Sequence, residues 1–170
     1  ADGYYMTNIE YGPKEIEIAG KSEVIDKIDI LTVTENIEGA TGDIKKEINL
    51  NDFLEEGLII VEEDETAFVN ITIEKEEIKR VTIKADDISI RNKPVSSVIL
   101  QTTGLITLEL SGPGSELDRI SSKAIKPYID LYHYTFGYGI IDVILQIEPI
   151  EDAVNVQLAN APRISVYISP

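Results

Sequence analysis

Hydrophobic and polar residues alternate along most of the chain. In residues 15–20, Ile16 and Ile18 would point to one face of an extended strand, while Glu15 and Glu17 would point to the other. Alternation in runs rich in β-branched residues, bounded by Gly, Pro or Asn, is typical of half-buried strands. The pattern predicts strands at 15–20, 67–76, 80–85, 87–92, 105–112, 142–149, 153–160 and 163–170. We therefore expect a mainly β protein.

Helical signals are few and short. Ser115 precedes an apolar turn and Asp118 stands three residues later, which predicts a capping box. Ser22 has the corresponding place before residues 23–28, and residues 51–57 contain a third signal of this kind. Segments this short are not stable as isolated helices. We therefore expect short helical turns between strands.

The apolar pattern occurs twice, at a constant spacing of 92 residues. Gly20 corresponds to Gly112, and the residues that follow each glycine share apolar positions. The same spacing relates Ile16 to Leu108, Ile18 to Leu110, Ile25 to Leu117, Ile28 to Ile120 and Ile37 to Ile129. A repeat of this length indicates two small tandem domains. We place copy one at residues 1–77 and copy two at residues 78–170.

The charge of the chain limits the classes of partner. Its 170 residues have a net charge of −16, and most of this charge lies in the first half. Residues 1–80 hold 8 basic and 21 acidic side chains, whereas residues 81–170 hold 7 and 10. Nucleic-acid phosphates require a basic surface, and anionic lipid headgroups would repel the acidic half. We expect no nucleic-acid partner and no direct binding to the membrane surface.

The sequence contains neither the cysteines of a disulfide framework nor an apolar segment that could anchor it in a membrane. It has no cysteine, which excludes disulfides, thiol catalysis and cysteine metal sites. No apolar run is long enough to span a bilayer, and the first residues lack the charged and apolar regions of a signal peptide. We expect any anchor or export signal to lie outside this sequence.

The reactive groups form no recognisable catalytic motif. His133 is the single histidine, and no serine stands in a G-x-S-x-G turn. Residues 112–115 lack the lysine and the further glycines of a phosphate-binding loop. The acidic runs at 62–65 and 86–87 lack the spacing of a calcium loop and are interpreted as solvated surface. We predict a protein that is not an enzyme and has no cofactor and no metal.

Aromatic side chains cluster where the repeat breaks. Tyr132, Tyr134, Phe136 and Tyr138 occupy alternate positions, so in a strand they would share one face. Copy one has no aromatic residue at the corresponding place. Exposed tyrosines provide a large contact area at low entropic cost. Two interpretations stay open: the rings cover the open end of the domain in a hairpin, or they contact a protein or glycan partner.

The order of these segments resembles the YbbR-like domain family. In copy one the resemblance rests on the strand at 13–20, the turn ending at residue 28, the segment 30–42 and the closing strand 67–74. In copy two it rests on residues 106–131 and 161–168, including Asp130 and Pro162. The resemblance implies tandem β-rich domains with short helical turns and no known catalytic residues. It also implies a place behind an N-terminal transmembrane helix, outside the cytoplasmic membrane of a bacterium.

The function that we expect from this resemblance is that of an interaction or scaffold module. The family includes the membrane-anchored regulator of the diadenylate cyclase, the enzyme that makes cyclic di-AMP. The expected partner is a protein, either the membrane cyclase through the full-length regulator or another envelope protein. The membrane would be reached only through an anchor outside this chain. The alternative is a cell-surface module that binds envelope glycan or a divalent cation and is unrelated to a cyclase.

Overall fold

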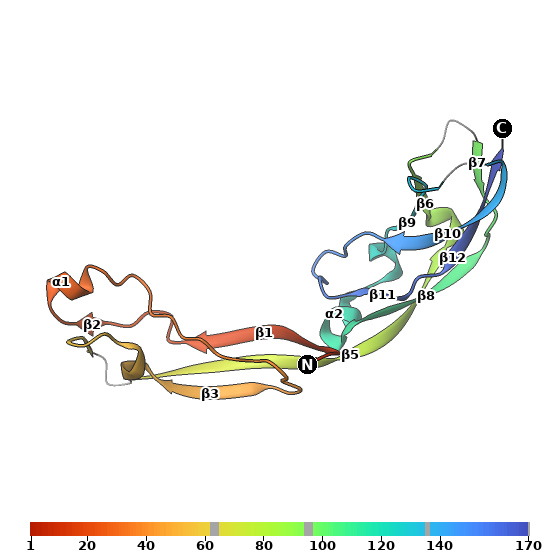
Figure 1. Ribbon diagram of the computed structural model, residues 1–170. Coiled ribbons are helices and arrows are strands. Elements are labelled where there is room, and N and C mark those ends of the chain that lie inside the picture. The colour runs from red at the N-terminus through yellow and green to blue at the C-terminus, as the bar shows by residue number, and fades with distance from the viewer. Residues whose placement is uncertain (62–64, 94–96, 135–136, 170) are drawn as a thin grey trace. The chain divides into compact units, whose positions relative to one another are not determined.

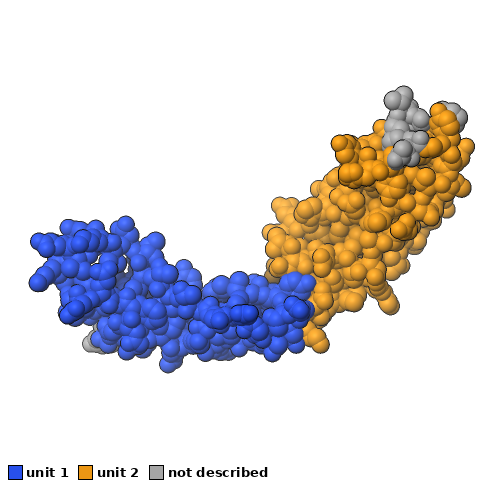
Figure 2. Space-filling model, in the orientation of Figure 1, with its two compact units in different colours: residues 1–74 blue, residues 75–170 orange. Residues whose placement is uncertain are grey.

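The computed structural model describes residues 1–61, 65–93, 97–134 and 137–169 and is mainly β, as the sequence predicts (Figure 1). The chain divides into two compact units, unit 1 (Ala1–Glu74) and unit 2 (Lys75–Pro170) (Figure 2). Strand β5 (Thr66–Lys84) contributes residues to both units, and the boundary that we predicted at residue 77 lies inside this strand.

Unit 1 is built around the first part of β5. Strands β1 (Tyr4–Gly12) and β3 (Ile44–Asn49) both pair with β5. The β3–β5 pairing is antiparallel and runs from Ile44 opposite Ile71 to Asn49 opposite Thr66. The remaining elements are short: β2 (Ile18–Ala19), α1 (Ser22–Ile25), the 3₁₀ turn η1 (Leu50–Phe53) and β4 (Ile59–Ile60), which pairs with β2.

Unit 2 contains part of one sheet and the whole of a second. In the first, residues 76–84 of β5 pair antiparallel with β8 (Leu105–Pro113), which pairs with β11 (Gln157–Asn160). The second has the order β6 (Ser89–Arg91), β9 (Pro127–Asp130), β10 (Gly139–Ile147), β12 (Arg163–Ser169) and β7 (Ser97–Leu100). Only the β6–β9 pair of this second sheet is parallel. The helical turns are η2 (Ala85–Asp87), α2 (Gly114–Arg119) and η3 (Ser122–Ala124).

The core of unit 2 is much larger than that of unit 1. Among the described residues of unit 2, 18 hydrophobic side chains are buried, and these include Leu110, Ile129 and Leu145, which have no exposed surface. Among the described residues of unit 1, the buried hydrophobic side chains are Leu50, Leu58, Ile60 and Ile71. Apolar burial is the main favourable term in folding. The described structure therefore gives unit 2 the stronger internal stabilisation.

Several boundaries differ from those predicted. The strand expected at 15–20 is restricted to Ile18–Ala19, the two residues that meet β4. The capping boxes are wrong, because the N-cap residues are Lys21 and Pro113 and neither makes a side-chain cap hydrogen bond. Ser22 and Ser115 lie inside the first turns instead. Strands β1, β3, β4, β7 and β9 were not predicted, because none of them follows a strict alternation of apolar and polar residues.

Truncating a fully buried side chain tests the core of unit 2. We expect Leu145→Ala to lower the free energy of unfolding by about 2–5 kcal/mol, because it removes buried surface and leaves a cavity. The control, Ile140→Ala on the same strand, should change it by less than about 0.5 kcal/mol, since Ile140 is 67% exposed. Denaturant unfolding measures both. Equal losses for the two variants would contradict this description of the core.

Candidate functional site

The predicted aromatic cluster lies in the connection between β9 and β10. This connection is a turn where it is described, and not a strand. The Asp130 carboxylate accepts hydrogen bonds from Tyr132 N (2.9 Å) and Asn92 Nδ2 (2.7 Å), and Tyr134 N donates to Leu131 O (3.1 Å). An aspartate that caps the backbone two residues ahead is a common cause of chain reversal. Asp130 therefore ends β9 and starts the turn.

The hydrogen bonds to Asp130 keep its carboxylate charged. The pKa of Asp130 lies below its usual value, first because of the hydrogen bond from Asn92 and then because of the one from Tyr132 N. On β8, Glu109 has a lowered pKa for a similar reason: Arg80 and Asn160 donate to it from the neighbouring strands. Both carboxylates are stabilised as anions, so neither is a proton donor at neutral pH.

The described rings of the cluster have different surroundings. Tyr132 and Tyr138 are each 71% exposed, whereas Tyr134 is half-buried and packs against the core of unit 2. Tyr132 also meets His133 edge to face, with ring centroids 4.9 Å apart. Phe136 lies outside the described residues. Because Tyr132 and Tyr134 belong to a turn, the expectation that alternate positions share one strand face does not hold for them.

A fourth tyrosine of this region, Tyr128, is held on the outer side of the second sheet. Its hydroxyl donates to Gln146 Oε1 (2.9 Å), and the Arg91 guanidinium lies 3.7 Å from its ring centroid. Arg91 also forms an ion pair with Glu148. Cross-strand contacts of this kind stabilise neighbouring strands. Tyr128 therefore links β6, β9 and β10.

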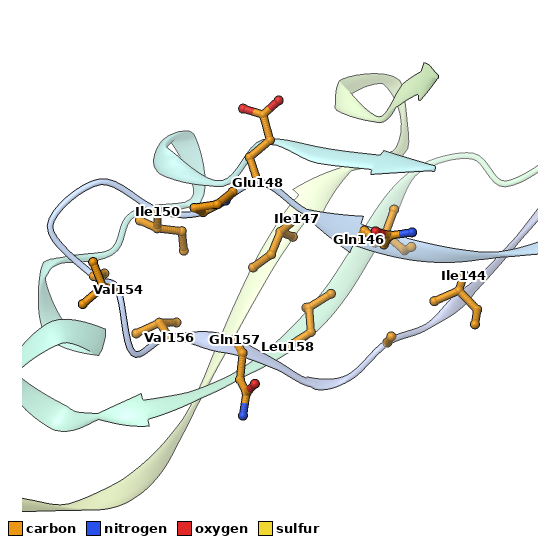
Figure 3. Close-up of a pocket in the computed structure, with 13 residues that line it drawn as sticks. Ile144, Gln146, Ile147, Glu148, Ile150, Val154, Val156, Gln157 and Leu158 are labelled. Atoms are coloured by element: carbon orange, nitrogen blue, oxygen red, sulfur yellow. The ribbon is translucent and has the colours of Figure 1, made fainter. Parts of the chain in front are cut away.

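An apolar groove lies between the end of β10 and β11, and sequence reasoning missed it (Figure 3). Its volume is about 410 Å³. Ile147, Ile150, Val156 and Leu158 converge in it, whereas Glu148 points away (Figure 3). Among the residues that line the groove, Glu148 is the one charged side chain, and its carboxylate is paired with Arg91 and Lys126. The lining is therefore suited to an apolar group and carries no acid–base pair.

The remaining sequence candidates do not form a site in the described structure. Asp86 and Asp87 are exposed in η2, and the acidic run at 62–65 lies largely outside the described residues. Within the residues that the structure describes, no group of three or more His, Cys, Asp or Glu side chains is placed to hold one metal ion. None of the described helices has the length and apolar character needed to cross a bilayer.

The two glycines that mark the repeat have matching surroundings. A Cβ atom on Gly112 would lie 2.8 Å from Val156 Cγ2 and 3.1 Å from Asn155 O. A Cβ atom on Gly20 would lie 2.5 Å from Leu58 Cδ2 and 2.9 Å from Gly57 O. Each glycine therefore permits the close approach of a neighbouring segment.

The elements around these glycines also correspond. Ile18 pairs with Ile60 in unit 1, and Leu110 pairs with Leu158 in unit 2. The helical turn after each glycine closes with an equivalent hydrogen bond, from Ile28 N to Ile25 O (3.0 Å) and from Ile120 N to Leu117 O (3.1 Å). Further along the chain, β3 pairs with β5 over six residue pairs, as β10 pairs with β12.

The comparison with known families agrees with the resemblance seen in the first copy. The family model described as "YbbR-like protein" matches residues 1–73. This range covers nearly all of unit 1, so this part of the chain is a YbbR-like domain, as its sequence predicts. No curated protein and no solved structure is significantly similar to the chain.

Alanine at either repeat glycine tests whether the two sites are structurally equivalent. We expect Gly20→Ala and Gly112→Ala each to lower the free energy of unfolding by about 1–3 kcal/mol, because the added methyl group meets backbone atoms. Gly42→Ala is the control, since a Cβ atom there has no heavy atom within 4 Å. It should be neutral or slightly stabilising, by up to about 1 kcal/mol. If Gly112→Ala left the free energy of unfolding unchanged while Gly20→Ala lowered it, the two glycine sites would not be structurally equivalent.

Serine substitutions distinguish the core-packed tyrosine from the exposed ones. Tyr134→Ser should lower the free energy of unfolding by about 1–3 kcal/mol, because it removes apolar contact with the core of unit 2. Tyr132→Ser and Tyr138→Ser should each change it by less than about 0.5 kcal/mol, because their rings lie mostly in solvent. Denaturant unfolding provides the comparison. A large loss at Tyr132 or Tyr138 would assign those rings a structural role.

Proposed function

We propose that this chain is a non-enzymatic interaction module formed by two tandem YbbR-like domains. The observation that carries the proposal is the YbbR-like match over residues 1–73. The matching glycine contacts, helical turns and strand pairings described above support a second copy in unit 2. In this proposal the repeated positions build the scaffold, and the contact surface lies where the copies differ.

The contact surface that we propose is the turn carrying Tyr132 and Tyr138. Both rings are 71% exposed, while Tyr134 holds the turn against the core and Asp130 fixes its backbone. The part of this turn at residues 130–134 is held in this way and loses little conformational freedom on binding. Rigid aromatic side chains are also enriched at protein interfaces. We include Phe136 in the surface on the basis of its position in the sequence.

The wider role that we propose follows from the family resemblance. The module belongs to the outer side of the bacterial cell membrane, as part of a membrane-anchored regulator of cyclic di-AMP synthesis. An envelope protein or the cyclase itself is the partner. A contact outside the membrane changes cyclase activity only if the partner binds two arrangements of the regulator with different affinity.

The second candidate function is a cell-surface module that binds envelope glycan or a divalent cation. The charge of unit 1 favours the cation: residues 1–74 hold 19 acidic and 5 basic side chains, a net charge of −14. Cation binding further requires several oxygen ligands at one place. The described carboxylates do not gather in this way, so we rank this function second.

Cyclic di-AMP production tests the proposed contact surface. The full-length regulator and the membrane cyclase are produced together in cells, and cyclic di-AMP is measured with and without Tyr132→Ser plus Tyr138→Ser. We expect the double variant to abolish most of the regulator's effect on cyclic di-AMP, because truncating central aromatic contacts commonly costs about 2 kcal/mol or more in binding. Tyr167→Ser is the control, since Tyr167 is a 37% exposed residue of β12.

Two outcomes would contradict the first function. The first is that the wild-type regulator leaves the cellular amount of cyclic di-AMP unchanged, which would contradict a role in regulating the cyclase. The second is that calorimetric titration of this chain with calcium or with cell-wall fragments shows saturable binding. That result would favour the second function instead.

A further inference from the structure

The apolar face of unit 1 around Gly20 is less buried than its counterpart in unit 2. Six apolar positions recur at the spacing of 92 residues. In unit 2 these positions are between 0% and 5% exposed, and they are Leu108, Leu110, Leu117, Ile120, Ile125 and Ile129. In unit 1 all six are only half-buried, and they are Ile16, Ile18, Ile25, Ile28, Val33 and Ile37. The six apolar positions are therefore covered by other residues in unit 2 and left partly exposed in unit 1.

In unit 2 the cover is a pair of strands at residues 76–91. The second part of β5 pairs antiparallel with β8, and β6 pairs parallel with β9. Val81, Ile83 and Ile88 are buried in the same core as the six positions, and Ile90 packs against it. These strands therefore supply both the apolar cover and the backbone partners for β8 and β9.

A lysine of this strand pair makes a further specific contact. Lys79 Nζ donates to Leu117 O (2.7 Å) and to Ile120 O (3.0 Å), the carbonyls at the end of α2. A positive charge is favourable there, because the carbonyl end of a helix carries partial negative charge. The corresponding carbonyls in unit 1 belong to Ile25 and Ile28. Unit 1 as a whole has a net charge of −14.

Among the described residues of unit 1, no strand takes the place of residues 76–91. Its strands β1, β3 and the first part of β5 correspond in their pairing to β7, β10 and β12, and β2 and β4 correspond to β8 and β11. The segment at 36–38, which corresponds to residues 128–130 of β9, is not a strand. In unit 2 that strand has β6 as its parallel neighbour. An absent neighbour on this side accounts for both the lost strand and the incomplete burial.

We propose that this face of unit 1 is a binding site for a pair of strands from a further repeat of the same kind. The first strand would pair antiparallel with residues 13–21, and the second would pair parallel with residues 36–38. The occupant has apolar residues at the positions of Val81, Ile83 and Ile88 and a lysine or arginine at that of Lys79. Strand addition gives affinity through backbone hydrogen bonds and specificity through alternate side chains.

This inference rests on the proposal that the two units are copies, and it does not depend on a role in cyclase regulation. It extends the function from contact at the aromatic turn to assembly between repeats. In unit 2 the covering strands begin where β5 continues from Glu74 of unit 1 into Lys75 of unit 2. In this proposal unit 1 is completed in the same way, by strands that continue from a further repeat. Stacking of units that bury one another's apolar faces is the general basis of repeat-protein stability.

The experiment adds a second copy of residues 75–92 directly ahead of Ala1 in the full chain. This extension preserves the spacing of 92, because Ala1 corresponds to Lys93. Hydrogen exchange is then measured by mass spectrometry or NMR with and without the extension. We expect the amides of residues 16–20 and 36–38 to exchange at least about tenfold more slowly with the extension than without it, because paired strand amides are protected. Residues 108–112 and 128–130 of unit 2 should not change.

The matched control is an extension of equal length with Val81→Ser, Ile83→Ser and Ile88→Ser in the added copy only. It should give no protection, and an extension carrying only Lys79→Glu should give less protection than the native extension. Equal exchange with the native and serine extensions would overturn the proposal. So would a dimer of the unextended chain, measured by light scattering, in which residues 16–20 are already protected by a second copy. Neither result bears on the cyclic di-AMP measurement, so the two proposals fail independently.

Discussion

Burial of one apolar face beneath a pair of strands is the interaction on which unit 2 depends. Residues of β8, β9 and α2 form this face, and the second part of β5 together with β6 closes it. Leu110 and Ile129 then have no exposed surface, and Val81 and Ile83 are buried against the same core. The close approach at Gly112 brings Val156 over the end of β8 and completes the enclosure. The aromatic turn between β9 and β10 packs against this core through Tyr134.

The aromatic turn between β9 and β10 is positioned by its contacts with the core of unit 2. Leu131 is fully buried and anchors the chain just after β9, while Asp130 holds the backbone that follows. Tyr134 returns to the core, and Tyr132 between these two anchors is directed into solvent. The turn is therefore placed by packing on one side and by hydrogen bonds on the other. Such a surface needs no reactive group, which is consistent with the role in binding that we propose.

Much of the fold of unit 2 was predictable from local pattern. The strands around residues 105–112, 142–149 and 163–170 follow strict alternation, and burial of one face confirms the reason for it. The less regular strands β1 and β3 were not predicted, because their pairing with β5 is what makes them strands. The capping serines were misplaced because the extended backbone continues through Pro113 before the helical turn starts. The groove beside β11 was missed because its lining comes from two segments, residues 144–150 and 153–161. The apolar pattern of each segment does not show that the two lie side by side.

The sequence by itself determined the mainly β class, the spacing of the repeat and the YbbR-like character of residues 1–73. These properties follow from period-two apolar patterns and from glycines, which act locally along the chain. The tertiary structure decided which apolar positions are covered and which tyrosines are exposed. Val33 and Ile125 have equivalent places in the pattern, yet only Ile125 is buried. Burial depends on the neighbouring strands that reach a position, and those strands lie far away in the sequence.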